Sequence, residues 1–247
     1  MTSTVGRVRA VMCGVLFAAL MGSGCSGLKV TTKSSDELPR YQIRSIALVP
    51  FTSIMTPQAR DQGDPFFSIP QNVRQSDMSV AIPPTRQPPN KQIVAVPSYA
   101  AEKMTQLFWT RLQSREGVLV VPLGDSIKAL SSTGDLGKAT PEVAAASVAK
   151  LVKADVALIG LVSVFQERVG SRFGANPPAS VGFEVTAVAA DGQVLWVGNY
   201  YERQRPMTED VVGFLQRWGA FVTAEELAQY GVEQMLKEFP FGGEGKK

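Results

Sequence analysis

Histidine is absent from the 247-residue chain, and only two cysteines are present. Without histidine, no Ser-His-Asp or Cys-His nucleophilic arrangement can form, and the commonest zinc ligand is missing. Gly134 and Gly137 are not followed by the Gly-Lys-Ser/Thr ending of a phosphate-binding loop. These absences exclude the common catalytic patterns, so we expect a protein that is not an enzyme and that has no cofactor or metal site.

Charge is also scarce. Charged residues make up 19% of the chain, and the formal net charge is +3. Loss of residues 1–24 would lower that charge to +1, because the only charged residues of this segment are Arg7 and Arg9. Domains that bind nucleic acid usually carry a strong basic excess. We therefore expect no nucleic-acid partner.

The chain begins with an export pattern. Arg7 and Arg9 precede an apolar run of 11 residues, Val11–Met21, and small residues follow it up to Cys25. This order is typical of a secretory signal, and the run is short for a membrane-spanning helix, which needs about 20 residues. Residues 1–24 are therefore predicted to be a signal peptide, and Cys13 would be removed with it.

Cys25 is the predicted lipidation site. Ser23-Gly24-Cys25 resembles the lipobox of bacterial lipoproteins, although Gly22 stands where that pattern usually has leucine. In that family the cysteine becomes the first mature residue and carries acyl chains such as palmitate. Each buried methylene contributes about 0.8 kcal/mol to membrane binding. The alternative is ordinary cleavage after Gly24, which leaves Cys25 as a free thiol.

The mature chain is predicted to contain a single domain. Residues 25–40 carry the lipid and are otherwise polar without a period, which indicates a tether. Residues 41–240 contain the apolar patterns of strands and helices, and residues 241–247 form a tail. Within the domain, residues 52–97 hold eight of the sixteen prolines, which disfavours both helix and interior strand.

Period-two and continuous apolar patterns predict the strands Tyr41–Phe51, Gly117–Leu123, Val156–Phe165 and a hairpin over Ser180–Tyr201. Asp191-Gly192 favours a two-residue type I′ turn in that hairpin. Trp196 is expected on its buried face, and Gly160 is expected to let a neighbouring element approach closely.

Helices are predicted over 98–114, 140–152 and 209–218 and after the capping box Thr223–Glu226. Residues 125–137 are predicted to be a turn-rich connection. Together these elements predict an α+β fold, with a mixed sheet of about five strands and helices packed on it.

Five residues are candidates for contacts with a partner. Phe66 and Phe67 are exposed anchors if the proline-rich insertion is a binding arm, whereas the alternative is a flexible surface insertion. Glu167, Glu184 and Arg203 lie on or beside apolar strands. They form either a recognition face or the ordinary solvent-facing side of a half-exposed sheet.

The order of these motifs resembles a group of bacterial envelope lipoproteins, which includes the curli-secretion lipoprotein, the penicillin-binding-protein activator lipoprotein and the amino-terminal domain of TolB. The matching residues are Leu48-Val49-Pro50-Phe51, Ala154-Asp155 with Gly160 and Val162, and Gly192 with Leu195-Trp196. The resemblance implies an α+β domain that is anchored by lipid and works through protein partners.

The resulting hypothesis is a non-enzymatic lipoprotein of the outer membrane that faces the periplasm. Its domain would bind an envelope protein of the cell-wall synthesis or secretion machinery. The alternative is a ring-forming secretion or transport subunit, which would be an oligomer.

Overall fold

The computed structural model describes residues 29–55, 58–60, 92–133, 139–217 and 219–243. They form a mixed sheet with helices packed on it, which confirms the predicted α+β class. None of the helices in these ranges is long and apolar enough to cross a membrane. The predicted signal peptide, Cys25, Phe66 and Phe67 lie outside the described residues.

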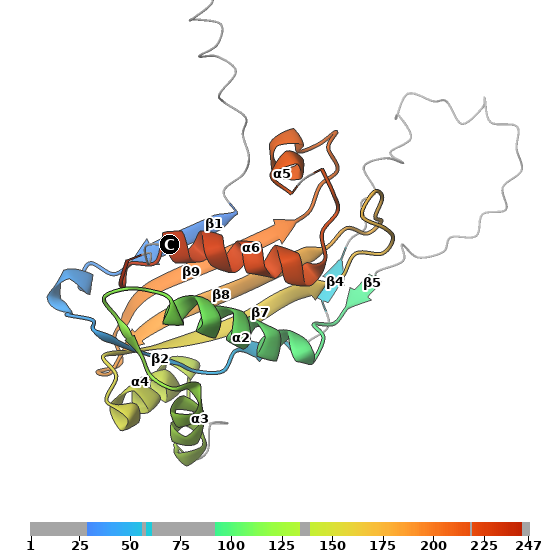
Figure 1. Cartoon of the computed structure of the whole chain (residues 1–247). Coiled ribbons are helices and arrows are strands. Elements are labelled where there is room, and N and C mark those ends of the chain that lie inside the picture. Colours follow the sequence, from blue (N-terminus) through green and yellow to red (C-terminus); the bar gives the residue numbers. More distant parts are fainter. Residues whose placement is uncertain (1–28, 56–57, 61–91, 134–138, 218, 244–247) are drawn as a thin grey trace, which may run out of the picture.

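A seven-stranded sheet forms the centre of the fold (Figure 1). Its strands are β1 (Val30–Ser34), β2 (Ser45–Leu48), β3 (Thr52–Ser53), β6 (Leu119–Val120), β7 (Val156–Gln166), β8 (Ser180–Ala189) and β9 (Val194–Arg203). Six of them lie in the order β1-β9-β8-β7-β2-β6, and β3 pairs with β7. The pairs β2–β6, β2–β7 and β3–β7 are parallel, and the pairs β7–β8, β8–β9 and β1–β9 are antiparallel.

The segment predicted as a tether is part of the sheet, which therefore has more strands than expected. β1 pairs with β9 from Val30–Tyr200 to Ser34–Trp196, and a 3-10 helix, η1 (Leu38–Arg40), follows it. The tether prediction was wrong here because β1 is an edge strand whose side chains are almost all exposed. Such a strand has a polar sequence without an apolar period.

Helices α2 (Tyr99–Gln113) and α6 (Ala224–Lys237) cover one face of the sheet (Figure 1). The core between these helices and the sheet includes the fully buried side chains of Phe108 from α2 and of Trp196 and Tyr200 from β9. The predicted capping box begins α6: the Thr223 hydroxyl accepts from the Glu226 amide at 3.1 Å, and the Glu226 carboxylate accepts from the Thr223 amide at 2.8 Å.

Helices α3 (Leu123–Ser132) and α4 (Pro141–Val152) pack on the opposite face. The Thr140 hydroxyl caps α4, as predicted. The expectation of a turn-rich connection over 125–137 was wrong for α3. This helix contains Gly124, Asp125 and three serines, residue types that favour turns and caps over helix interiors, so its sequence resembles a connection.

The hairpin of β8 and β9 is confirmed, and Trp196 is 1% exposed. Its turn is not type I′, because Asp191 does not have positive φ, whereas Gly192 has a φ of +100°. The Gly192 amide donates to the Ala189 carbonyl at 2.9 Å, and the register shifts between Ala187 and Val188. A turn followed by a glycine with positive φ is the usual three-residue loop with a bulge.

The first predicted strand is shorter than expected, and the chain after it rejoins the sheet. β2 ends at Leu48, and β3 pairs with β7 although it lies within the proline-rich segment. A separate two-stranded sheet pairs β4 (Gln58–Arg60) with β5 (Gln92–Val94). Both fall in proline-free stretches, and β3, β4 and β5 each have a single partner strand, so none of them is the interior strand that the prolines disfavour. The Phe51 ring lies where a Cβ on Gly160 would be, which confirms the predicted close approach.

Asp155 joins the start of β2 to the start of β7. Its Oδ2 accepts from the amides of Arg44 and Ser45 at 2.8 and 2.9 Å and from the Ser45 hydroxyl at 2.8 Å. Burial acts to raise the pKa of Asp155, but these hydrogen bonds outweigh it and hold the pKa below its ordinary value.

We expect Asp155→Asn to lower the free energy of unfolding by about 1–3 kcal/mol at neutral pH, because bonds to a charged acceptor are lost. A carboxyl group with a lowered folded pKa stabilises the fold above its unfolded pKa, about 3.9, and this contribution is lost as the pH falls through the folded pKa. Urea unfolding at several pH values is the measurement. A difference between variant and wild type that does not shrink at acid pH would contradict the assignment.

Candidate functional site

On the face that α3 and α4 cover elsewhere, one end of the sheet is not covered by any part of the chain that the structure describes. The register aligns Leu161 of β7, Glu184 of β8, Asn199 of β9 and Thr31 of β1 in one row. All four side chains are exposed. They alternate with core residues that face α2 and α6, so they point away from those helices. We call these four residues and Tyr201 the open sheet face.

A groove of about 430 Å³ crosses the open sheet face. Its lining comes from β1, β7, β8, β9 and the residue before β1: Lys29, Thr31, Leu161, Ser163, Phe183, Glu184, Asn199, Tyr200 and Tyr201. It offers a carboxylate, an amide and hydroxyl groups beside an exposed tyrosine ring, which suits hydrogen bonding to a polypeptide. Within the described ranges, no three His, Cys, Asp or Glu side chains are placed to hold a metal ion.

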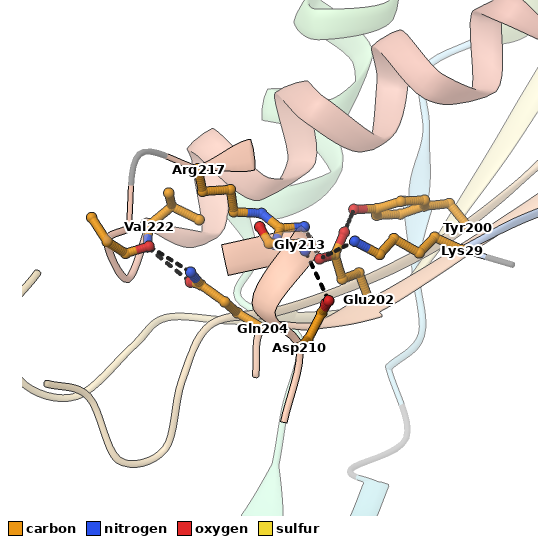
Figure 2. A network of polar contacts seen from close by, with 9 residues as sticks. Lys29, Tyr200, Glu202, Gln204, Asp210, Gly213, Arg217 and Val222 are labelled. Atoms are coloured by element: carbon orange, nitrogen blue, oxygen red, sulfur yellow. Dashed lines mark hydrogen bonds and ion pairs between the residues drawn. The ribbon is translucent and has the colours of Figure 1, made fainter. Parts of the chain in front are cut away.

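A buried ionic network lies at the same end of the sheet, on the side of α6 (Figure 2). Glu202 is 4% exposed and accepts from the Tyr200 hydroxyl at 2.6 Å, from Lys29 Nζ at 3.1 Å and from the Arg217 guanidinium. The guanidinium also lies over the Tyr230 ring, 5.2 Å from its centroid. Glu202 therefore attracts two cations in a largely dry environment, and the Asp210 carboxylate adds to the attraction for Lys29.

Burial shifts the pKa values of this network. It lowers the pKa of Arg217 and is the main cause of a lowered pKa at Lys29, where the nearby Arg217 charge adds to the effect. It also raises the pKa of Tyr200. Each shift disfavours the charged form of its group, which is the expected result of desolvation. Lys29 and Arg217 therefore stay charged in this buried position because the Glu202 carboxylate attracts both of them.

The network fixes the chain between β9 and α6. Arg217 directly follows helix α5 (Val211–Gln216) and donates to the carbonyl of Gly213 within that helix at 2.8 Å. Asp210 caps α5 through the Gly213 amide, so the helix begins later than the predicted start at 209. The Gln204 side chain joins the Ala220 carbonyl at 2.6 Å and the Val222 amide at 2.8 Å (Figure 2).

The three candidate charged residues that the structure describes have different surroundings. Glu184 lies on the open sheet face, opposite Asn199 and Leu161. Arg203 is exposed at the end of β9. The Glu167 carboxylate accepts from the Ala224 amide at 3.1 Å, at the start of α6. The roles of all three in binding stay predictions.

The sequence contains one signal for the network. Glu202 continues the alternation of the inward-facing Trp196, Gly198 and Tyr200 along β9, so its burial follows from the period. Lys29 and Arg217 carry no comparable signal, because only the tertiary fold brings them to Glu202.

No family model and no curated protein matches the sequence. Solved structures that are similar in part include the PelC dodecamer from Paraburkholderia phytofirmans, with 13% identity over 88% of this chain and 98% of that chain and a TM-score of 0.42. Lipoprotein GNA1162 from Neisseria meningitidis has 14% identity over 70% and 91% and a TM-score of 0.38. The LpoB C-terminal domain from Escherichia coli has 10% identity over 76% and 94% and a TM-score of 0.35.

One of these structures is a bacterial lipoprotein. All three TM-scores lie below 0.5, so these likenesses carry no argument about function or assembly.

Proposed function

We propose that this chain is a non-enzymatic lipoprotein of the outer membrane whose periplasmic domain binds a protein partner through the open sheet face. The open sheet face is the observation that carries the proposal. Three neighbouring strands present exposed Glu184, Asn199, Leu161 and Tyr201 where none of the described helices packs, although helices pack elsewhere on both faces of the same sheet. Aromatic and polar side chains together are typical of protein interfaces.

The anchoring part of the proposal depends on the export pattern and Cys25. Lys29, the first residue that the structure describes, lies four positions after this cysteine in the sequence. An envelope protein of the cell-wall synthesis or secretion machinery is the partner class that the sequence resemblance implies. Phe66 and Phe67 are further candidate contacts of that partner.

Cys25→Ser is expected to release the protein from membranes, because it removes the only acylation site of the mature chain. Fractionation of the envelope, combined with metabolic labelling by a fatty-acid analogue, is the measurement. Equal labelling of the wild type and the variant would contradict the lipoprotein proposal.

Glu184→Lys is expected to lower the yield of partner crosslinked in the native envelope several-fold, because it reverses the only carboxylate among the residues that line the groove. Its side chain is exposed, so stability should change by less than about 0.5 kcal/mol. Glu102→Lys is the matched control: it makes the same charge change on α2, on the other side of the sheet. Equal yields from the two variants would remove the open sheet face from the interface.

A further inference from the structure

The chain between the predicted anchor and the folded domain is very short. Cys25 and Lys29 are separated by Ser26, Gly27 and Leu28. A fully extended chain spans at most about 3.6 Å per residue, so the two Cα atoms lie within about 14 Å of each other. If residues 25–40 were a tether, as the sequence suggested, the reach would be about 50 Å by the same rule.

Lys29 is held at one end of the sheet. Its carbonyl accepts from the Tyr201 amide at 3.1 Å, and its Nζ is 3.1 Å from the buried Glu202 carboxylate. The last residue of β9, Arg203, pairs with Ser180, which in turn pairs with Gln166 at the end of β7. This end of the sheet therefore stays close to any lipid attached to Cys25.

Two segments extend beyond this end of the sheet, residues 167–179 between β7 and β8 and residues 204–217 and 219–223 between β9 and α6. They are joined by bonds from the Phe221 amide to the Arg172 carbonyl at 2.8 Å and from the Gln204 amide to the Ala179 carbonyl at 3.0 Å. Figure 1 shows α5 at the same end of the molecule as the start of β1 and the end of β9. The two segments form one structural unit beside Lys29.

Exposed apolar side chains gather on these two segments. Phe173 is 92% exposed, and the others are between 52% and 62% exposed: Val169, Met207, Val211 and Leu215. Three exposed arginines accompany them, Arg172, Arg203 and Arg205. The exposed carboxylate of Glu209 is also present, whereas that of Glu167 is bonded to the Ala224 amide. We call this surface the basic apolar rim.

We propose that the basic apolar rim rests on the phospholipid surface of the membrane and inserts Phe173 and the exposed side chains of α5 into its interface. This proposal depends on lipidation of Cys25, which is part of the proposed function. Apolar side chains interspersed with arginine are the composition of surfaces that lie in a bilayer interface, where arginine pairs with phosphate groups. The short connection to Cys25 favours lipid over protein as the partner of the rim. The distance between a membrane-anchored Cys25 and Lys29 is too small for a layer of protein between the membrane and the rim.

Contact of the rim with the membrane would also orient the proposed interface with a partner. The open sheet face lies on strands whose ends carry the rim, so a rim held at the membrane fixes the direction in which Glu184 and Asn199 are presented. A partner would meet this face beside the membrane, at a distance set by the strands and not by a flexible tether.

The test uses the full mature lipoprotein with a single engineered cysteine, at Phe173→Cys or Leu215→Cys, labelled with an environment-sensitive fluorophore. Leu151→Cys on α4 is the matched control, because Leu151 is 56% exposed and lies close before the start of β7, at the opposite end of the sheet. Mass spectrometry first counts the acyl chains on Cys25. Each labelled protein is then placed in vesicles of phosphatidylethanolamine and phosphatidylglycerol that contain nitroxide-labelled lipid.

We expect several-fold stronger quenching at Phe173→Cys and Leu215→Cys than at Leu151→Cys, with a shift of emission to shorter wavelength. An acylated protein whose rim labels remain in water overturns this proposal and leaves the proposed function intact. A shift of emission without lipid quenching, dependent on protein concentration, overturns it in favour of a second copy on the rim. A protein without acyl chains overturns the anchoring part of the proposed function and this proposal together.

Discussion

Trp196→Ala is expected to lower the free energy of unfolding by about 3–5 kcal/mol, the usual cost of removing a large buried aromatic side chain. Trp196 is 1% exposed and lies edge-on to Phe239, with ring centroids 5.1 Å apart. The indole also covers Gly198, where an added Cβ would come within 2.4 Å of Cη2. Gly198 of β9 and Phe239, which follows α6, both contact the indole, so the surrounding structure cannot easily collapse into the cavity.

Urea unfolding of the mature protein in detergent measures this effect. Tyr201→Ala is the matched control, because Tyr201 belongs to the same strand but points to the opposite face and is 53% exposed. Its loss should change stability by about 0.5 kcal/mol or less. A Trp196→Ala effect as small as that of the control would place the indole outside the core and contradict the packing of α6 on β9.

The parts of the fold that follow from sequence are those with strong local patterns. The hairpin of β8 and β9 has long apolar alternation, and α4 and α6 begin at residues whose side chains cap them. These signals are local because each depends on residues within a few positions of one another. The order of the strands and the assignment of helices to the two faces of the sheet are not local properties, so the sequence did not predict them.

The parts that were missed are stabilised by distant residues. β1 has a polar sequence and exists because β9 offers an unpaired edge. α3 contains Gly124, Asp125 and three serines, which favour turns over helix interiors when read locally. The position of Glu184 on the strand was predictable, but its neighbours Leu161, Asn199 and Thr31 follow only from the register of four strands. A candidate surface of this kind therefore requires the tertiary structure.

The network at Glu202 gives the second large expected effect. Glu202→Ala should lower the free energy of unfolding by about 3–5 kcal/mol, because removing one partner of a buried ion pair leaves an uncompensated charge. Here two charges are left: the Arg217 side chain is 5% exposed and that of Lys29 is 20% exposed. Arg217 Nε already lacks a hydrogen-bond partner in the described structure, so the guanidinium depends strongly on this carboxylate.

Two matched variants separate charge from packing. Glu202→Gln keeps the volume and a hydrogen-bond acceptor for the Tyr200 hydroxyl, so the part of the loss that it reproduces is due to charge. The double variant Glu202→Ala with Arg217→Met removes the stranded guanidinium as well. It should be less destabilised than the sum of the two single variants, because residues of one buried network are coupled.

The pH dependence of Glu202→Ala provides a further check through Lys29. Burial and the Arg217 charge already lower the Lys29 pKa, and loss of the carboxylate should lower it further. Between that folded pKa and the ordinary lysine value of about 10.4, the unfolded chain binds more protons than the folded one. The stability of the variant should therefore rise with pH across this window. Urea midpoints for Glu202→Ala that stay level toward alkaline pH, together with a loss below about 0.5 kcal/mol, would show that water reaches these side chains and that the network is not buried.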